Sequence, residues 1–286
     1  MNLNLDTRQQ NDETSSENVA FVHRPPNHIE MEELRLVLST FRDGTGMLNL
    51  KNVSGTLPGW RDFERSVAAI FKGESQESKF LFDVLIPSSS GDHFYGISCK
   101  MRGELKTRFR TGRVTMELSN ASKAFQSRLE GAGISRRDFE QRPAEVGEVV
   151  IGLVEEWKEA ASTNIGGIID VDKSSHLCLL YDKGSGDYQL YWYGMGLPNP
   201  KDLSWEYYRR RNTDKGHIRA TDTVGRVLFE YYPDSGGQLK YFPLAESAIW
   251  QSNVFQLEKV PLDSEDLILI TKARAYFPSL WPRRSD

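Results

Sequence analysis

The sequence predicts an α/β fold with a β-rich C-terminal half, and two observations support this prediction. Apolar residues recur at helical spacing over residues 29–41 and 60–71, near the start of the chain. Short runs rich in aliphatic and aromatic residues begin at residue 80, and such runs dominate the chain after Gly166. This order favours an α/β core sheet with a β-rich elaboration.

The composition indicates a soluble protein of the cytoplasm with one large domain. The 286 residues are 38% hydrophobic and 11% aromatic, which is enough for a sizeable core, and residues 19–286 are assigned to one domain. Residues 1–18 are polar and predict a flexible tail. The chain has no apolar run of membrane-spanning length and no signal-peptide pattern, and its two cysteines form no disulfide framework.

The first half of the chain predicts two helices, then two strands, then a third helix. Residues 29–41 and 60–71 form the first two helices, and the second has an apolar face. Residues 80–86 and 93–100 form two strands joined by a serine-rich turn. Residues 116–129 predict the third helix, which a glycine closes.

The second half predicts mostly strands. Residues 149–157 fit a helix or a strand equally well. Residues 177–181 and 188–193 predict a hairpin, because a Gly-Ser-Gly turn separates them, and residues 227–232 and 239–242 predict another. The catalytic core is expected over about residues 60–131, and a β-rich region for DNA recognition and dimerisation over about residues 165–260.

Three chemically distinctive residues stand in series along the predicted helix and strands. Glu64 lies on the second helix, Asp83 lies inside an otherwise apolar strand, and Lys100 ends the next strand. A carboxylate in such a strand is costly unless it is paired or binds a metal. Asp83 and Lys100 can meet at one sheet edge, where a carboxylate that holds Mg²⁺ and a lysine that acts on water suit phosphodiester hydrolysis.

This order of helix Glu, strand Asp and strand-end Lys resembles the PD-(D/E)xK core of type II restriction endonucleases. The resemblance covers about residues 60–130 and implies a central mixed sheet flanked by helices, Mg²⁺-dependent cleavage of double-stranded DNA, and a homodimer. It also implies that Asp83 is a metal ligand, that Lys100 is the catalytic lysine, that Cys99 offers its backbone carbonyl to the metal, and that Glu64 is the helix acid.

The sequence departs from the family pattern at two positions. Phe82 stands where a proline often precedes the aspartate, and Ser98 stands at the (D/E) position. A serine hydroxyl is neutral, so another acid should point at the metal. Glu117, at the start of the predicted third helix, is the expected supplier, and Glu104 is a nearer option that would need a tight reversal of the chain.

Two basic segments predict where DNA binds. Cations crowd residues 100–113, opposed only by Glu104, although the chain as a whole is net acidic at −4. A second segment mixes tyrosines with cations over residues 207–219. The expected DNA-binding residues are Arg102, Lys106, Arg108, Arg110, Arg113, Arg209, Arg210 and Arg211.

Other interpretations of the same residues stay open. Asp83 and Lys100 fit a cross-strand ion pair, Glu64 a solvated helix residue, and Glu117 a carboxylate that compensates a helix dipole. Both basic segments fit solvated surface. At the level of function, the alternatives are a less specific repair-type nuclease and a non-cleaving DNA-binding protein that retains the fold. The histidines lack zinc-site spacing, and no phosphate-binding or dinucleotide-binding loop is present.

Overall fold

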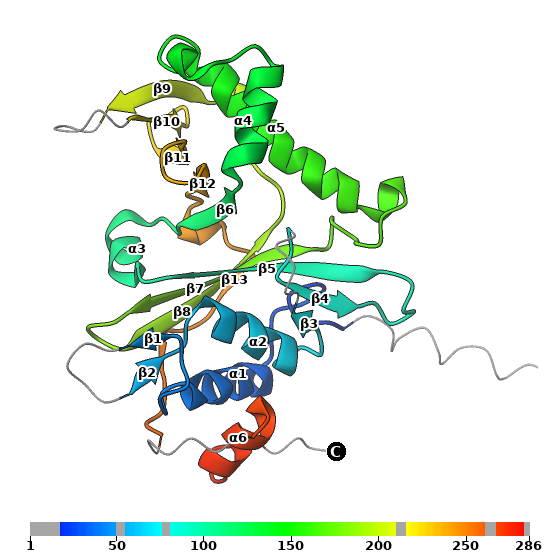
Figure 1. Ribbon diagram of the computed structural model, residues 1–286. Coiled ribbons are helices and arrows are strands. Elements are labelled where there is room, and N and C mark those ends of the chain that lie inside the picture. Colours follow the sequence, from blue (N-terminus) through cyan, green and yellow to red (C-terminus); the bar gives the residue numbers. More distant parts are fainter. Residues whose placement is uncertain (1–17, 50–54, 76–80, 210–215, 261–266, 283–286) are drawn as a thin grey trace, which may run out of the picture.

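The structure is a computed structural model that describes residues 18–49, 55–75, 81–209, 216–260 and 267–282. In this part of the chain the fold is α/β, with a mixed sheet flanked by helices (Figure 1). Of the predicted N-terminal tail, residues 1–17 lie outside the described residues. No described helix is both long enough and apolar enough to cross a membrane.

The mixed sheet, called here the main sheet, forms the middle layer of the molecule. Its strands in spatial order are β13 (Trp250–Gln251), β8 (Asp187–Gly194), β7 (Ser175–Asp182), β5 (Phe94–Arg102), β4 (Val84–Pro87) and β3 (Glu74–Ser75), and β14 (Phe255–Gln256) also pairs with β8. The pair β5 and β7 is parallel, whereas the other pairs are antiparallel. The hairpin predicted over residues 177–193 is confirmed as β7 and β8.

Helices α1 (His28–Thr40), α2 (Trp60–Ile70) and α6 (Leu269–Tyr276) cover one face of the main sheet (Figure 1). Asn27 caps α1 through a capping box with Glu30. The face of α2 predicted to be apolar is buried, with Phe63 and Val67 fully enclosed in the same core as Ile97 of β5. Burial of this stripe fixes the rotation of α2, and therefore the direction in which its other side chains point.

The opposite side of the main sheet carries the short helix α3 (Leu105–Thr111) and a second sheet. The strands of this second sheet are, in spatial order, β6 (Met116–Asn120), β12 (Gln238–Tyr241), β11 (Val227–Tyr232), β10 (Gly216–Thr221) and β9 (Ser204–Arg209). All of its pairings are antiparallel, and the hairpin predicted over residues 227–242 is confirmed as β11 and β12.

Helices α4 (Ser122–Gly131) and α5 (Pro143–Ala161) flank one face of the second sheet (Figure 1). They enclose a core of their own, which includes Phe125, Val150 and Phe229. The segment over residues 149–157, which fits two structures in the sequence, is helical because it lies within α5. The remaining short elements are β1 (Leu48–Asn49), β2 (Thr56–Leu57), η1 (Arg136–Asp138), η2 (Thr163–Ile165), η3 (Pro200–Asp202) and η4 (Ala245–Ser247).

The helix predicted over residues 116–129 is wrong in its first part. Residues 116–120 form strand β6, and the helix begins only at Ser122. The segment Met116-Glu117-Leu118-Ser119 alternates apolar and polar side chains, which is the period of a strand, and Met116 is buried whereas Glu117 is partly exposed. The structure also adds α3, which lies in the first basic segment.

Candidate active site

The pairing of β4 with β5 places Asp83 beside the end of the strand that carries Lys100. Val84 pairs with Ile97, so Asp83 lies one residue before β4 and opposite Ser98. Its backbone N–H donates to the Ile97 carbonyl at 3.0 Å. Its carboxylate Oδ2 accepts a 2.7 Å hydrogen bond from the Cys99 backbone N–H. The strand register therefore fixes the position of the Asp83 carboxylate.

Lys100 meets this carboxylate from the neighbouring strand. Its Nζ lies 3.4 Å from Asp83 Oδ2, and both side chains are partly exposed to solvent. Ser98, Lys100 and Arg102 alternate along β5 and therefore share one face of the strand. The predicted juxtaposition of Asp83 and Lys100 is present, and the pair is open to a ligand from solvent.

Glu64 approaches the same carboxylate from α2. It is buried, and burial raises its pKa to about 7, an effect that the nearby charge of Asp83 increases. Lys100, Arg61 and Arg65 oppose the shift but do not cancel it. A buried carboxylate whose pKa is raised by a second acid marks a site where a bound cation would be strongly stabilised.

The donors near Asp83 fit a hard metal ion such as Mg²⁺. Carboxylate oxygens from Asp83 and Glu64 are its preferred protein ligands, and Mg²⁺ usually keeps several waters beside one or two carboxylates. The Cys99 thiol is buried and its pKa is raised well above the usual range, so its backbone carbonyl is the donor left to consider. Among the described residues, no cluster of three or more His, Cys, Asp or Glu side chains is arranged around one point.

The position at which the resemblance predicts a second acid is occupied by a neutral group. Ser98 is buried, and its hydroxyl lies 3.5 Å from Asp83 Oδ2. The two acids considered as replacements lie elsewhere. Glu104 accepts hydrogen bonds from Thr115 and from Arg102, the latter at 3.1 Å. Glu64 is thus the acid whose charge interacts with Asp83.

Glu117 lies on strand β6 of the second sheet and not at the start of a helix. Its Oε2 accepts a 2.9 Å hydrogen bond from Gln238 Nε2 and lies 3.5 Å from the Arg102 guanidinium. The expectation that Glu117 points back at Lys100 depended on the helix that is now replaced by β6. The structure brings Glu117 to Arg102, two residues farther along β5 than Lys100.

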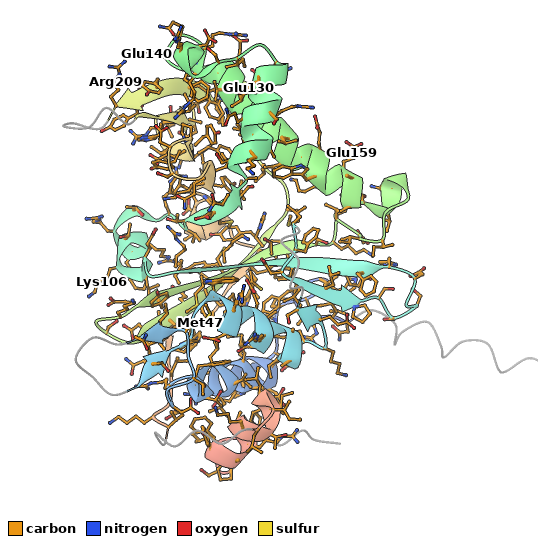
Figure 2. The ribbon with its side chains drawn as sticks, in the orientation of Figure 1. Met47, Lys106, Glu130, Glu140, Glu159 and Arg209 are labelled. Carbon is orange, nitrogen blue, oxygen red and sulfur yellow. The ribbon has the colours of Figure 1, made fainter. Side chains whose placement is uncertain are left out.

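The first basic segment divides into paired and free cations. Arg108 donates to Gln251 at 3.0 Å and packs over Tyr191, and Arg113 donates to the Phe242 carbonyl. Lys106 projects from α3 (Figure 2) and is largely exposed, although its Nζ lies 2.9 Å from Asp182. Arg110 is exposed and makes no ion pair with a described residue.

The second basic segment lies at the end of the second sheet far from the main sheet. Arg209 is exposed and pairs with Glu140 at 2.6 Å, and the two side chains lie together there (Figure 2). Arg210 and Arg211 lie outside the described residues. Of the three consecutive arginines predicted to bind DNA, Arg209 is therefore the one that the structure describes.

One buried histidine beside the site is not among the residues predicted from the sequence. His176 of β7 pairs with Ser98 in the parallel register, and its Nδ1 has no hydrogen-bond partner among the described residues. Burial, together with the charges of Lys100 and Lys158, lowers the pKa of His176 to about 3. The imidazole is therefore neutral at pH 7. Only the parallel pairing of β5 with β7 reveals that it neighbours Ser98.

No protein-family model matches this chain, and no curated protein and no solved structure matches it either. The function is therefore inferred from the geometry of the site and from the resemblance of its motif.

Proposed function

We propose that this protein is a Mg²⁺-dependent endonuclease that cuts double-stranded DNA, with a restriction-endonuclease-like core formed by α2, β4 and β5. The observation that carries the proposal is the contact of Asp83 with Lys100 on adjacent strands, with Glu64 buried behind it. The order of the three residues along the chain and their convergence in space both match what the motif requires.

Each residue has a distinct role in this proposal. Asp83 and Glu64 would hold Mg²⁺ together with the Cys99 carbonyl. When bound, Mg²⁺ supplies Lewis acidity at the scissile phosphate and lowers the pKa of the attacking water. Lys100 orients that water by hydrogen bonding and offsets the negative charge that grows on the phosphate oxygens in the transition state.

A structural ion pair is the competing interpretation of Asp83 and Lys100, and Glu64 argues against it. A pair that serves only stability gains nothing from a second buried carboxylate, because that carboxylate adds repulsion and a desolvation cost. Burial and the charge of Asp83 both raise the pKa of Glu64, so Asp83 disfavours the ionised form of Glu64. A cation between the two acids removes this conflict.

The experiment is a plasmid-cleavage assay with Mg²⁺, with EDTA, and with the Lys100→Ala variant. We expect discrete fragments with Mg²⁺, none with EDTA, and at least about 100-fold slower cleavage by Lys100→Ala. DNA binding by the variant should stay within a few-fold, because Lys100 acts on the chemical step. The control is Lys201→Ala, which removes an exposed lysine of η3.

The assay also separates the alternatives. A smear of fragments would favour a less specific nuclease, and the absence of cutting would favour a non-cleaving DNA-binding protein. Cleavage by Lys100→Ala at the rate of the Lys201→Ala control would reject the proposed active site.

A further inference from the structure

The two faces of the second sheet differ sharply in character. One face is apolar and packs against α5, with Ile218, Phe229 and Leu239 fully buried. Gly147 of α5 lies so close to Trp205 of β9 that a side chain at this position would collide with the indole ring. The sheet is therefore held firmly to its helices on this side. On its opposite face Glu206 and Tyr208 are exposed and Arg219, Gln238 and Lys240 are partly exposed, whereas His217 and Glu230 are buried.

The opposite face carries charged side chains aligned across the strands. Glu206 pairs with Arg219, Arg219 with Glu230, Glu230 with Lys240, and Lys240 with Glu117. Directly paired residues of neighbouring strands project to the same side of a sheet. A second row of paired side chains, His217 with Tyr208 and Tyr232 with Gln238, runs beside the first. The polar face, as we name this surface, consists of Glu206, Arg219, Glu230, Lys240 and Glu117 with Tyr208, His217, Tyr232 and Gln238.

The carboxylates of the polar face are fixed by partners within it. Glu230 accepts hydrogen bonds from Arg219 at 2.9 Å and from Tyr232, and its Oε1 lies 3.2 Å from His217 Nε2. Burial alone would raise the pKa of Glu230, but the bonds from these neighbours lower it to about 2. Glu230 is therefore ionised and oriented at neutral pH, as is expected of a preformed hydrogen-bonding surface.

The cations of the polar face are held over aromatic rings. The Arg219 guanidinium lies 3.9 Å from the centre of the Tyr208 ring, and Lys240 Nζ lies 4.8 Å from that of Tyr232. Lys240 forms no salt bridge with a described residue and is partly exposed. Its three donors are therefore available to an incoming acceptor, on a side chain whose position the ring restricts.

The polar face begins where the proposed active site ends. Arg102 follows Lys100 by two residues on β5, so both point to the same side of the strand. The Arg102 guanidinium lies 3.5 Å from Glu117, the last member of the charged row. A ligand with a phosphate at Lys100 would therefore extend along Arg102 onto this surface.

We propose that the polar face reads the base edges of double-stranded DNA, an inference that rests on the proposed nuclease function. Within the polar face the acids Glu117, Glu206 and Glu230 outnumber the cations Arg219 and Lys240, so this surface is not built to bind phosphates alone. Its alternating donors and acceptors instead match base edges in the major groove, where lysine and arginine bind guanine, glutamine binds adenine, and carboxylates accept from cytosine. Strands serve as groove readers in known DNA-binding folds.

The test compares base preference in Lys240→Ala, Gln238→Ala and the control Lys201→Ala. A duplex library with randomised sequence is cut in Mg²⁺ and the fragment ends are sequenced. The same library is also bound in Ca²⁺, and the bound fraction is sequenced. We expect the preference for the favoured base to fall at least about 10-fold at one or two positions in each polar-face variant. Lys201→Ala should keep the wild-type preference.

The binding arm separates this inference from the nuclease proposal. Lys100→Ala should select the same sequences as the wild type in Ca²⁺, because it removes no group of the polar face. If the wild type binds selectively without cutting and Lys240→Ala changes the selection, the nuclease proposal fails and the polar face stands as the reading surface.

Three results would overturn the inference. The first is that both polar-face variants keep the base preference of the wild type. The second is that the wild-type protein cuts without any base preference. The third is that the wild-type protein selects no sequence in either the cleavage or the binding experiment. Circular dichroism melting checks that the variants are folded. Lys240→Gln, which keeps a polar side chain of similar length, replaces Lys240→Ala if the latter unfolds.

Discussion

At the proposed active site, the two carboxylates lie in different surroundings. Asp83 accepts a hydrogen bond from the Cys99 N–H and lies beside Lys100, so neighbours compensate its charge directly. Glu64 projects from α2 into a buried position, and its pKa is raised by burial and by the charge of Asp83. Asp83 therefore has direct partners, whereas Glu64 is held at a cost that a bound cation would remove.

Asp83→Asn tests the first acid with little change in shape. The asparagine oxygen can still accept from the Cys99 N–H, so we expect the fold to persist. Loss of the charge should slow single-turnover cleavage at least about 100-fold and abolish the Mg²⁺ dependence of DNA binding. Single-turnover kinetics and a Mg²⁺ titration of binding measure both effects. Normal cutting by the folded variant would leave Asp83 and Lys100 as an ion pair alone.

Glu64→Gln should stabilise the metal-free protein at alkaline pH. An unfolded glutamate ionises near pH 4.5, whereas Glu64 in the fold ionises near pH 7. Between these values the unfolded chain loses a proton that the folded chain keeps, so stability falls as pH rises and stays lower above pH 7. Glutamine removes this loss, which we put at about 1 kcal/mol after allowance for solvent screening.

Urea unfolding in EDTA at pH 4 and pH 8 measures this effect. Glu64→Gln should match the wild type at the lower pH and exceed it at the higher one. The control is Glu246→Gln, which changes an exposed acid of η4. Equal stability of Glu64→Gln and the wild type at both pH values would mean that Glu64 is not under electrostatic strain.

At the scale of elements, α3 links the catalytic strand to the outer surface of the molecule. It begins three residues after β5 ends, and it directs Lys106 and Arg110 into solvent while Arg108 packs inward against Tyr191. The cations of the first basic segment are therefore not equivalent. Those that point outward can contact phosphates, whereas Arg108 and Arg113 support the fold.

Neutralising Lys106 and Arg110 together should weaken the dependence of DNA binding on salt. Each lost phosphate contact reduces the slope of log K against log[salt] by about 0.9 in duplex DNA. We therefore expect the double alanine variant to have a slope smaller by about 1 to 2, as measured by fluorescence anisotropy over a range of NaCl concentrations. An unchanged slope would move the phosphate contacts to the neighbourhood of Arg209.

The sequence predicts some of these elements well because the residue pattern that defines each one lies within a short stretch of the chain. The apolar stripe of α2 and the turn between β4 and β5 are contained in short windows, so the contact of Asp83 with Lys100 can be anticipated from local patterns. Glu117 is misplaced because a strand of five residues beside a helix has too few periods to be recognised. Its hydrogen-bond partner Gln238 lies far along the chain, and no local sequence pattern predicts the contact between them.

At the scale of the whole molecule, strands that lie far apart in the sequence pair with one another in the main sheet. Strands β7 and β8, which come from the predicted β-rich region, complete the same sheet as β4 and β5. The parallel register of β5 with β7 places His176 beside Ser98. Register between distant strands depends on the tertiary fold, so the sequence does not reveal that β7 pairs with β5 or that His176 lies beside Ser98.

We expect the protein to act on DNA as a homodimer. A double-strand cut needs two active sites that face opposite strands, and a two-fold protein matches a two-fold DNA site. Light scattering of the protein, free and bound to a duplex, should give twice the mass of the 32.6 kDa chain. A single chain in both states would instead require that the two strands be cut one after the other.

The parallel pairing of β5 with β7 also sets an order of assembly during synthesis. β5 leaves the ribosome with β4 as its antiparallel neighbour, and residues 103–174 must be made before β7 can join it. Until then β5, with Lys100, is an edge strand whose free N–H and C=O groups can pair with other chains. A chain cut short before Ser175 should therefore aggregate, and the closure of this long loop should slow folding.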